Sequence, residues 1–120
     1  MPKVPSWEKF EHYIQDLLKL DSTICSGNQW HDVGDAVSRG HYTEEPFRFV
    51  ADCKYTEQKG FRLDFKFLNN WVMKGLELGR IFIMPIRFSD AETKKNFDYV
   101  VLTLDDFHML ADLAKLNQHK

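Results

Sequence analysis

Residues 47–54 read Phe-Arg-Phe-Val-Ala-Asp-Cys-Lys, a partly alternating pattern that predicts a β-strand. Successive side chains of a strand point to opposite faces of the sheet. Asp52 and Lys54 should therefore share one face, with Cys53 on the other. Lys59 and Gly60 end the strand. Because an acid and a lysine on one strand face are more often solvated than catalytic, the rest of the chain must decide what this pair does.

Helical and strand patterns alternate on both sides of this strand. Upstream, apolar spacing predicts a helix over 7–20 with Ser6 as its N-cap, and then a short strand near 32–38. Downstream we expect a helix over 63–78 that ends at Gly79, strands over 80–88 and 99–104, and a last helix over 105–116 capped by Asp105 or Asp106. The order α-β-β-α-β-β-α predicts one α/β (α+β) domain over 1–120, a mixed central sheet flanked by helices.

The composition is that of a folded protein. Of the 120 residues, 43% are hydrophobic and 28% charged, which is enough for a real core. We expect a cytoplasmic protein with no membrane partner, because the chain has neither an apolar run of roughly 18 residues nor an apolar leader. Its two cysteines suit a reducing compartment. The net charge is -2, yet residues 39–95 carry eleven basic and eight acidic side chains, which permits a surface that faces phosphates.

A second carboxylate is expected beside Asp52. Asp35 falls in Gly-Asp-Ala-Val, residues 34–37, and pairing of the two strands would bring Asp35 and Asp52 to one point. Two convergent carboxylates suit Mg²⁺ or Mn²⁺. Lys54 would then position or deprotonate an attacking water and offset negative charge in the transition state. Asp32 is a rival ligand, ranked lower because the strand continues behind Asp35.

The order of these features over residues 7–88 resembles the PD-(D/E)XK nuclease superfamily, and within it the small archaeal- and phage-type Holliday-junction resolvases. Asp35 matches the acid of the family's hairpin. Asp52 and Lys54 match its acid-x-Lys motif, with Asp where these resolvases more often have Glu. Glu11 matches the glutamate of their N-terminal helix, because apolar residues follow it three and seven positions later. Cys-Ser-Gly at 25–27 resembles their Gly-Ser-Gly loop with the first glycine replaced, which leaves Ser26 as a phosphate contact.

This resemblance implies a restriction-endonuclease-like core and a Mg²⁺-dependent endonuclease. Such an enzyme would cut two opposed strands of a branched, four-way DNA as a homodimer. Glu11, Asp35 and Asp52 are the implied metal ligands, and Lys54 the implied catalytic lysine. Three alternatives stay open, and two of them share this fold: another nuclease of the superfamily, of restriction, repair or flap type, and a non-catalytic DNA-binding module. A plain protein-interaction domain is the third, supported by the slightly acidic chain.

Basic side chains around this core are candidate DNA contacts. Lys66 and Lys74 share one helix face with Asn70 between them. The remaining candidates for DNA binding are Ser26, Arg39, Lys59 and Arg62. An ordinary solvated helix face explains the Lys66 and Lys74 pattern equally well.

Overall fold

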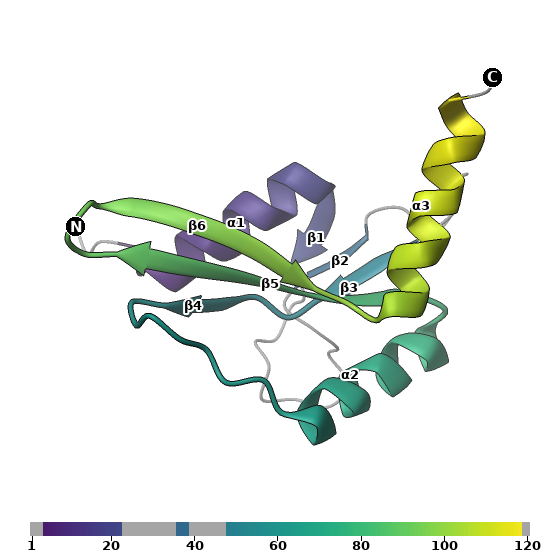
Figure 1. The fold of residues 1–120 in the computed structure, drawn as a ribbon, viewed down its shortest axis with the longest axis horizontal. Coiled ribbons are helices and arrows are strands. Elements are labelled where there is room, and N and C mark those ends of the chain that lie inside the picture. The colour runs from purple at the N-terminus through teal and green to yellow at the C-terminus, as the bar shows by residue number, and fades with distance from the viewer. Residues whose placement is uncertain (1–3, 23–35, 39–47, 119–120) are drawn as a thin grey trace.

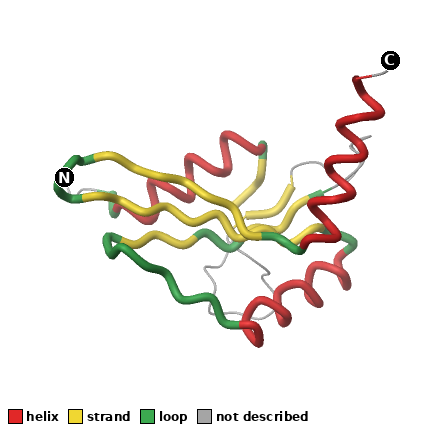
Figure 2. The backbone as a smooth tube through the Cα atoms, viewed as in Figure 1, coloured by secondary structure: helices red, strands yellow, loops and turns green. Residues whose placement is uncertain are grey.

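The computed structural model describes residues 4–22, 36–38 and 48–118. The elements run α1 (Ser6–Leu18), β1 (Leu20–Ser22), β2 (Ala36–Ser38), β3 (Phe49–Ala51), β4 (Lys54–Thr56), α2 (Phe65–Leu78), β5 (Ile81–Asp90), β6 (Lys95–Val101) and α3 (Leu104–Gln118). The mixed α/β class predicted from the sequence is confirmed (Figures 1 and 2).

The strands of the described residues form one mixed sheet of six. β1, β2 and β3 pair in antiparallel fashion, whereas β3 and β4 both run parallel to β5, and β6 returns antiparallel along the other side of β5. Phe49 lies opposite Ile81 and Lys54 lies opposite Ile86, so β3 and β4 keep the same register along β5. They are one strand interrupted at residues 52–53, where sequence analysis predicted an unbroken strand. Across the break the Asp52 amide still donates to the Ile83 carbonyl, at 3.1 Å.

The N-terminal helix differs from its prediction at both ends. Pro5 is its N-cap and no side chain caps it, so Ser6 is its first helical residue rather than its cap. It ends at Leu18 because Lys19 adopts a left-handed conformation, with φ 56°. Leu20 therefore leaves the helix and begins β1, an edge strand of three residues that the sequence pattern did not reveal.

The downstream elements also shift by a few residues. Gly79 ends α2 as predicted, with φ 67°, a conformation that glycine adopts without a steric penalty. β5 and β6 meet in a hairpin, so β6 begins at Lys95 rather than at residue 99. The cap of α3 is Thr103, whose hydroxyl oxygen accepts a hydrogen bond from the Asp106 amide at 3.0 Å. The two aspartates predicted as caps lie in the first turn of α3 instead.

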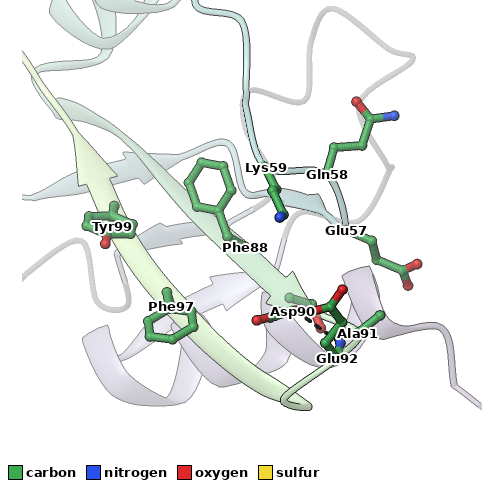
Figure 3. Close-up of a pocket in the computed structure, with 10 residues that line it drawn as sticks. Glu57, Gln58, Lys59, Phe88, Asp90, Ala91, Glu92, Phe97 and Tyr99 are labelled. Carbon is green, nitrogen blue, oxygen red and sulfur yellow. Dashed lines mark hydrogen bonds between the residues drawn. The ribbon is translucent and has the colours of Figure 1, made fainter.

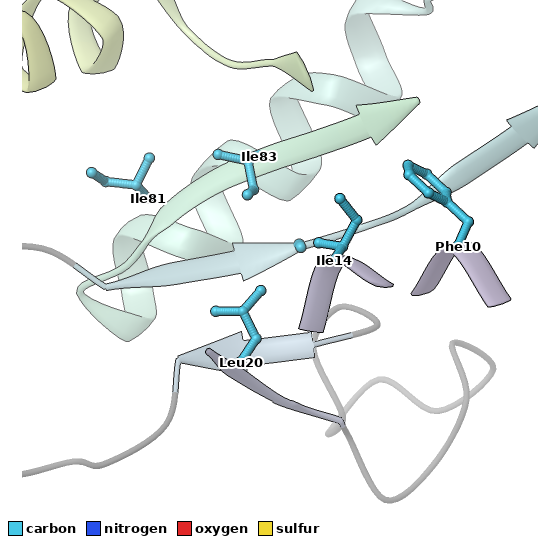
Figure 4. Packing of buried hydrophobic residues seen from close by; sticks show 6 residues of the cluster. Phe10, Ile14, Leu20, Ile81 and Ile83 are labelled. Carbon is cyan, nitrogen blue, oxygen red and sulfur yellow. The ribbon is translucent and has the colours of Figure 1, made fainter. Parts of the chain in front are cut away.

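Two apolar clusters lie on opposite faces of the sheet. One joins α1 to the strands and has at its centre Phe10, Ile14, Leu20, Ala51, Ile81 and Ile83 (Figure 4). The other contains Val50, Phe82, Met84 and Ile86, and packs against α2 through Leu68, Trp71 and Val72. Figure 1 shows α1 and α2 on opposite sides of the sheet, with the β5–β6 hairpin extending beyond α2. Side-chain alternation along the strands produces this three-layer arrangement.

Helix α2 approaches β5 closely at a single glycine. A Cβ atom built on Gly75 would lie 2.9 Å from the Arg80 carbonyl oxygen and 3.4 Å from the Phe82 nitrogen. One turn away, the Trp71 ring stacks on Phe82 with a centroid separation of 5.6 Å. The absence of a side chain at Gly75 thus lets α2 come close enough for Trp71 to cover β5.

Arg87 connects α1 to β6 on one face of the sheet. Its guanidinium group donates two hydrogen bonds to the Asp98 carboxylate, at 2.7 and 2.8 Å. It also lies over the rings of Phe10 and Tyr13, at 4.7 and 5.2 Å from their centroids.

No helix in the described part of the chain is long and apolar enough to cross a membrane.

Candidate active site at the break between β3 and β4

Asp52 lies at the strand break and is the buried charged residue of the described core, with 7% of its surface exposed. Lys54 is two residues further on, and its Nζ lies 3.0 Å from Asp52 Oδ2. Cys53 packs instead against the α1-side cluster. The period-two argument from the sequence is therefore confirmed, because Asp52 and Lys54 meet on one face and Cys53 faces the other.

One oxygen of this buried carboxylate has no hydrogen bond. Asp52 Oδ2 forms an ion pair with Lys54 at 3.0 Å, but no described residue makes a hydrogen bond to it. Lys54 offsets the charge of this oxygen, but its desolvation is only partly repaid because a hydrogen bond is lacking among the described residues. A hard cation that takes oxygen ligands would satisfy it, so the chemistry of this residue fits Mg²⁺ or Mn²⁺.

Glu11 contributes a second carboxylate from α1. Burial raises the pKa of Glu11 above its ordinary value of 4.5, and the negative charges of Glu8 and Asp52 add to this effect. His12 and Lys54 act in the opposite direction. Asp52 and Lys54 thus lie close enough to Glu11 to influence its proton affinity. A cation between the two carboxylates would relieve their repulsion.

Lys54 projects from the sheet toward the beginning of α2. Its ammonium group lies over the Phe67 ring, 5.1 Å from the centroid, and a third of the side chain remains exposed. It lines a cavity of about 280 Å³ together with Phe61, Arg62, Leu63, Asp64, Phe67 and Met84. The lysine is therefore held between a carboxylate and an aromatic ring at the wall of an open space. Sequence reasoning did not assign Phe67 to the site, because its place in the first turn of α2 gives no sign that it faces the β4 strand.

Three predicted site residues lie outside the described residues: Asp35, the second carboxylate of the predicted pair, and the DNA contacts Ser26 and Arg39. The described ranges contain no group of three histidine, cysteine, aspartate or glutamate side chains able to hold a metal ion. In these ranges the carboxylates of the site are Glu11 and Asp52.

The candidate DNA contacts do not form one continuous stripe. Arg62 shares the cavity of Lys54. Lys59 lines a different cavity beside the β5–β6 hairpin, with Asp90. Lys66 is exposed on α2 and Lys74 is half-buried on the same helix. Of these four cations, Arg62 is the one that the structure brings to the same cavity as the Asp52–Lys54 pair.

Comparison of the chain with family models, with curated proteins and with solved structures found no match.

Proposed function

We propose that this protein is a metal-dependent endonuclease that cuts branched DNA, acting on four-way junctions as a homodimer with a restriction-endonuclease-like core. The observation that carries the proposal is the pairing of Asp52 and Lys54. A buried carboxylate, one oxygen of which makes no hydrogen bond with the described residues, lies 3.0 Å from a lysine ammonium at the wall of a cavity. A fold alone does not need this arrangement, since a buried ion pair is often no more stabilising than apolar side chains of similar volume.

Glu11 and Asp52 would hold the Mg²⁺ or Mn²⁺ ion, and Asp35 is the proposed third ligand. When bound, the ion would stabilise the negative charge that develops on the scissile phosphate. Lys54 Nζ would orient the attacking water or take its proton, and its position beside Asp52 at the wall of the cavity supports this role. Arg62 lines the same cavity and would contact a phosphate.

The product of each cut would be a strand break in the phosphodiester backbone. Selectivity for junctions would arise from where phosphates can reach the two sites of the homodimer, because phosphate contacts position a nucleic acid without reading its bases. The basic excess over residues 39–95 supports binding to the backbone even though the whole chain carries a net charge of -2.

The test is cleavage of a labelled four-way junction beside matched duplex, flap and single-stranded DNA. Each is incubated with Mg²⁺, with Ca²⁺ and with EDTA. The variants are Asp52→Asn and Lys54→Ala, and the matched controls are Asp112→Asn and Lys115→Ala on α3. We expect paired cuts in the junction with Mg²⁺, lost with EDTA and in both site variants, and kept in both controls. Lys54→Ala should still bind the junction.

Other outcomes assign other functions. If the protein cuts flaps or duplexes instead of junctions, it is still a nuclease, but its substrate differs from the one proposed. Junction binding without cutting, under every metal, would indicate a non-catalytic DNA-binding module. If the protein neither binds nor cuts the junction, the proposal is refuted. A protein-interaction domain is then the remaining function. The melting temperature with and without Mg²⁺ separates metal binding from catalysis, because a ligand that binds the folded state raises it.

A further inference from the structure

A second cavity lies at the far end of the sheet and plays no part in the proposed cleavage. It has a volume of about 550 Å³ and lies between residues 57–59, which follow β4, and the β5–β6 hairpin. Its apolar wall consists of Phe88 on β5 and of Phe97 and Tyr99 on β6 (Figure 3). Its rim carries Glu57, Lys59, Asp90 and Glu92.

The three rings are on one face of the sheet because of the strand register. Phe88 and Phe97 are directly opposite in the β5–β6 pair, and Tyr99 is two residues further along β6. The Phe88 and Tyr99 rings meet edge to face at 5.9 Å. Phe88 belongs to the α2-side cluster, but α2 covers the other end of that face (Figure 1). Phe97 and Tyr99 consequently remain 48% and 61% exposed.

The charges around these rings are unbalanced. Hydrogen bonds from the Glu92 amide and the Thr93 hydroxyl lower the pKa of Asp90, and Lys59 lowers it further. Asp90 is therefore already engaged in the hairpin turn and offset by Lys59, whose side chain extends toward Phe88 in Figure 3. Glu57 and Glu92 make no ion pair with any described residue. Two carboxylates at the rim of the cavity thus have no ion-pair partner among the described residues.

We propose that this cavity binds an arginine or lysine side chain from a basic segment of a partner protein. Aromatic faces attract cations, and arginine stacks on them particularly well. Glu57 and Glu92 would supply the opposite charge at the rim. The same carboxylates would repel the phosphates of a nucleic acid, so the charge balance favours a basic peptide over a single strand whose bases stack on the rings.

The test uses fluorescence anisotropy of the whole protein with three labelled probes: a peptide of four Gly-Arg repeats, the same peptide with Gln for Arg, and a thymidine octamer. The arginine peptide should bind more tightly than either of the other two. The double variant Glu57→Gln/Glu92→Gln should weaken its binding about tenfold, and Tyr99→Ala about fivefold. Tyr99→Phe keeps the ring and should bind as wild type does. Glu77→Gln removes an exposed charge on α2 and is the matched control.

Lys59→Met distinguishes the two kinds of ligand. It should strengthen binding of the arginine peptide, because it removes a competing cation. If the cavity instead takes nucleotides, the same substitution should weaken binding of the thymidine octamer. The proposal is overturned if the octamer binds best and loses affinity in Tyr99→Ala. Equal weakening by Glu77→Gln and by the Glu57/Glu92 double variant would overturn it too, since attraction would then be spread over the whole acidic chain. Circular dichroism of each variant shows that the fold is retained.

Discussion

The ion pair between Arg87 and Asp98 provides the sharpest test of how the fold positions the site. Arg87 donates two hydrogen bonds to Asp98 and covers the rings of Phe10 and Tyr13. Those rings flank Glu11 on α1, so the same contact fixes the helix that carries a site carboxylate. Arg87→Gln removes the charge and the bidentate geometry while keeping part of the side-chain volume.

The structure sets the size of the expected effect. Exposed ion pairs contribute at most about 1 kcal/mol, whereas breaking a buried pair costs about 3–5 kcal/mol. The Arg87 and Asp98 side chains are 15% and 32% exposed, which places this pair between the two cases. We therefore expect a coupling energy of about 1.5 kcal/mol between Arg87 and Asp98. The lost ring contacts bring the total for Arg87→Gln to about 2–3 kcal/mol.

The assay is a double-mutant cycle of urea unfolding with Arg87→Gln, Asp98→Asn and the double variant. Lys115→Gln on α3 controls for the loss of a positive charge. At about 4 °C per kcal/mol for a chain of this size, Arg87→Gln should lower the melting temperature by about 8–12 °C. Arg87→Lys should recover little of this loss, because lysine cannot make the bidentate bond.

If the effects of the two single substitutions add within about 0.5 kcal/mol, Arg87 and Asp98 do not stabilise each other, since independent sites behave in that way. A second outcome concerns α1 alone. The cycle could show strong coupling while Arg87→Gln leaves unchanged the pH dependence of stability that Glu11 contributes. It would mean that the pair stabilises the sheet without positioning α1.

Three further predictions concern stability. Gly75→Ala gains about 1 kcal/mol of helix propensity but places a Cβ 2.9 Å from the Arg80 carbonyl oxygen, so we expect a net loss of about 1 kcal/mol in chemical denaturation. Gly60→Ala, with nothing within 4 Å, should be neutral, and an equal loss there would contradict the close-approach argument. The folded state binds the Glu11 proton more tightly than the unfolded chain, so stability should fall as pH rises from about 4.5 through the raised pKa and then level off. Glu11→Gln should abolish this decline and be more stable than wild type at pH 7 without metal; a pH profile of melting temperature identical to that of wild type would show that Glu11 is not responsible. Thr103→Ala should cost about 1 kcal/mol by removing the α3 cap, and no change in thermal melting would assign the cap elsewhere.

Local chemistry alone determined much of this protein. The alternation around Asp52 placed it with Lys54 on one face, because neighbouring side chains of an extended backbone point in opposite directions. Gly79 indicated where α2 ends, because a left-handed residue closes a helix at little cost when it is glycine. The apolar spacing of α1 and α2 indicated which helices pack on the sheet. Each of these features depends on a few consecutive residues.

Tertiary structure decided what depends on distant residues. The strand break at Asp52 cannot be read from residues 47–54, because β5 sets the register on both of its sides. Burial between separate elements leaves Asp52 Oδ2 without a hydrogen bond from the described residues, and it raises the pKa of Glu11. The aromatic cavity at the hairpin required the cross-strand pairing of Phe88 with Phe97. Sequence therefore determined which residues carry charge and which face they take, and only packing decided which charges are buried, because burial depends on what covers a residue from elsewhere in the chain.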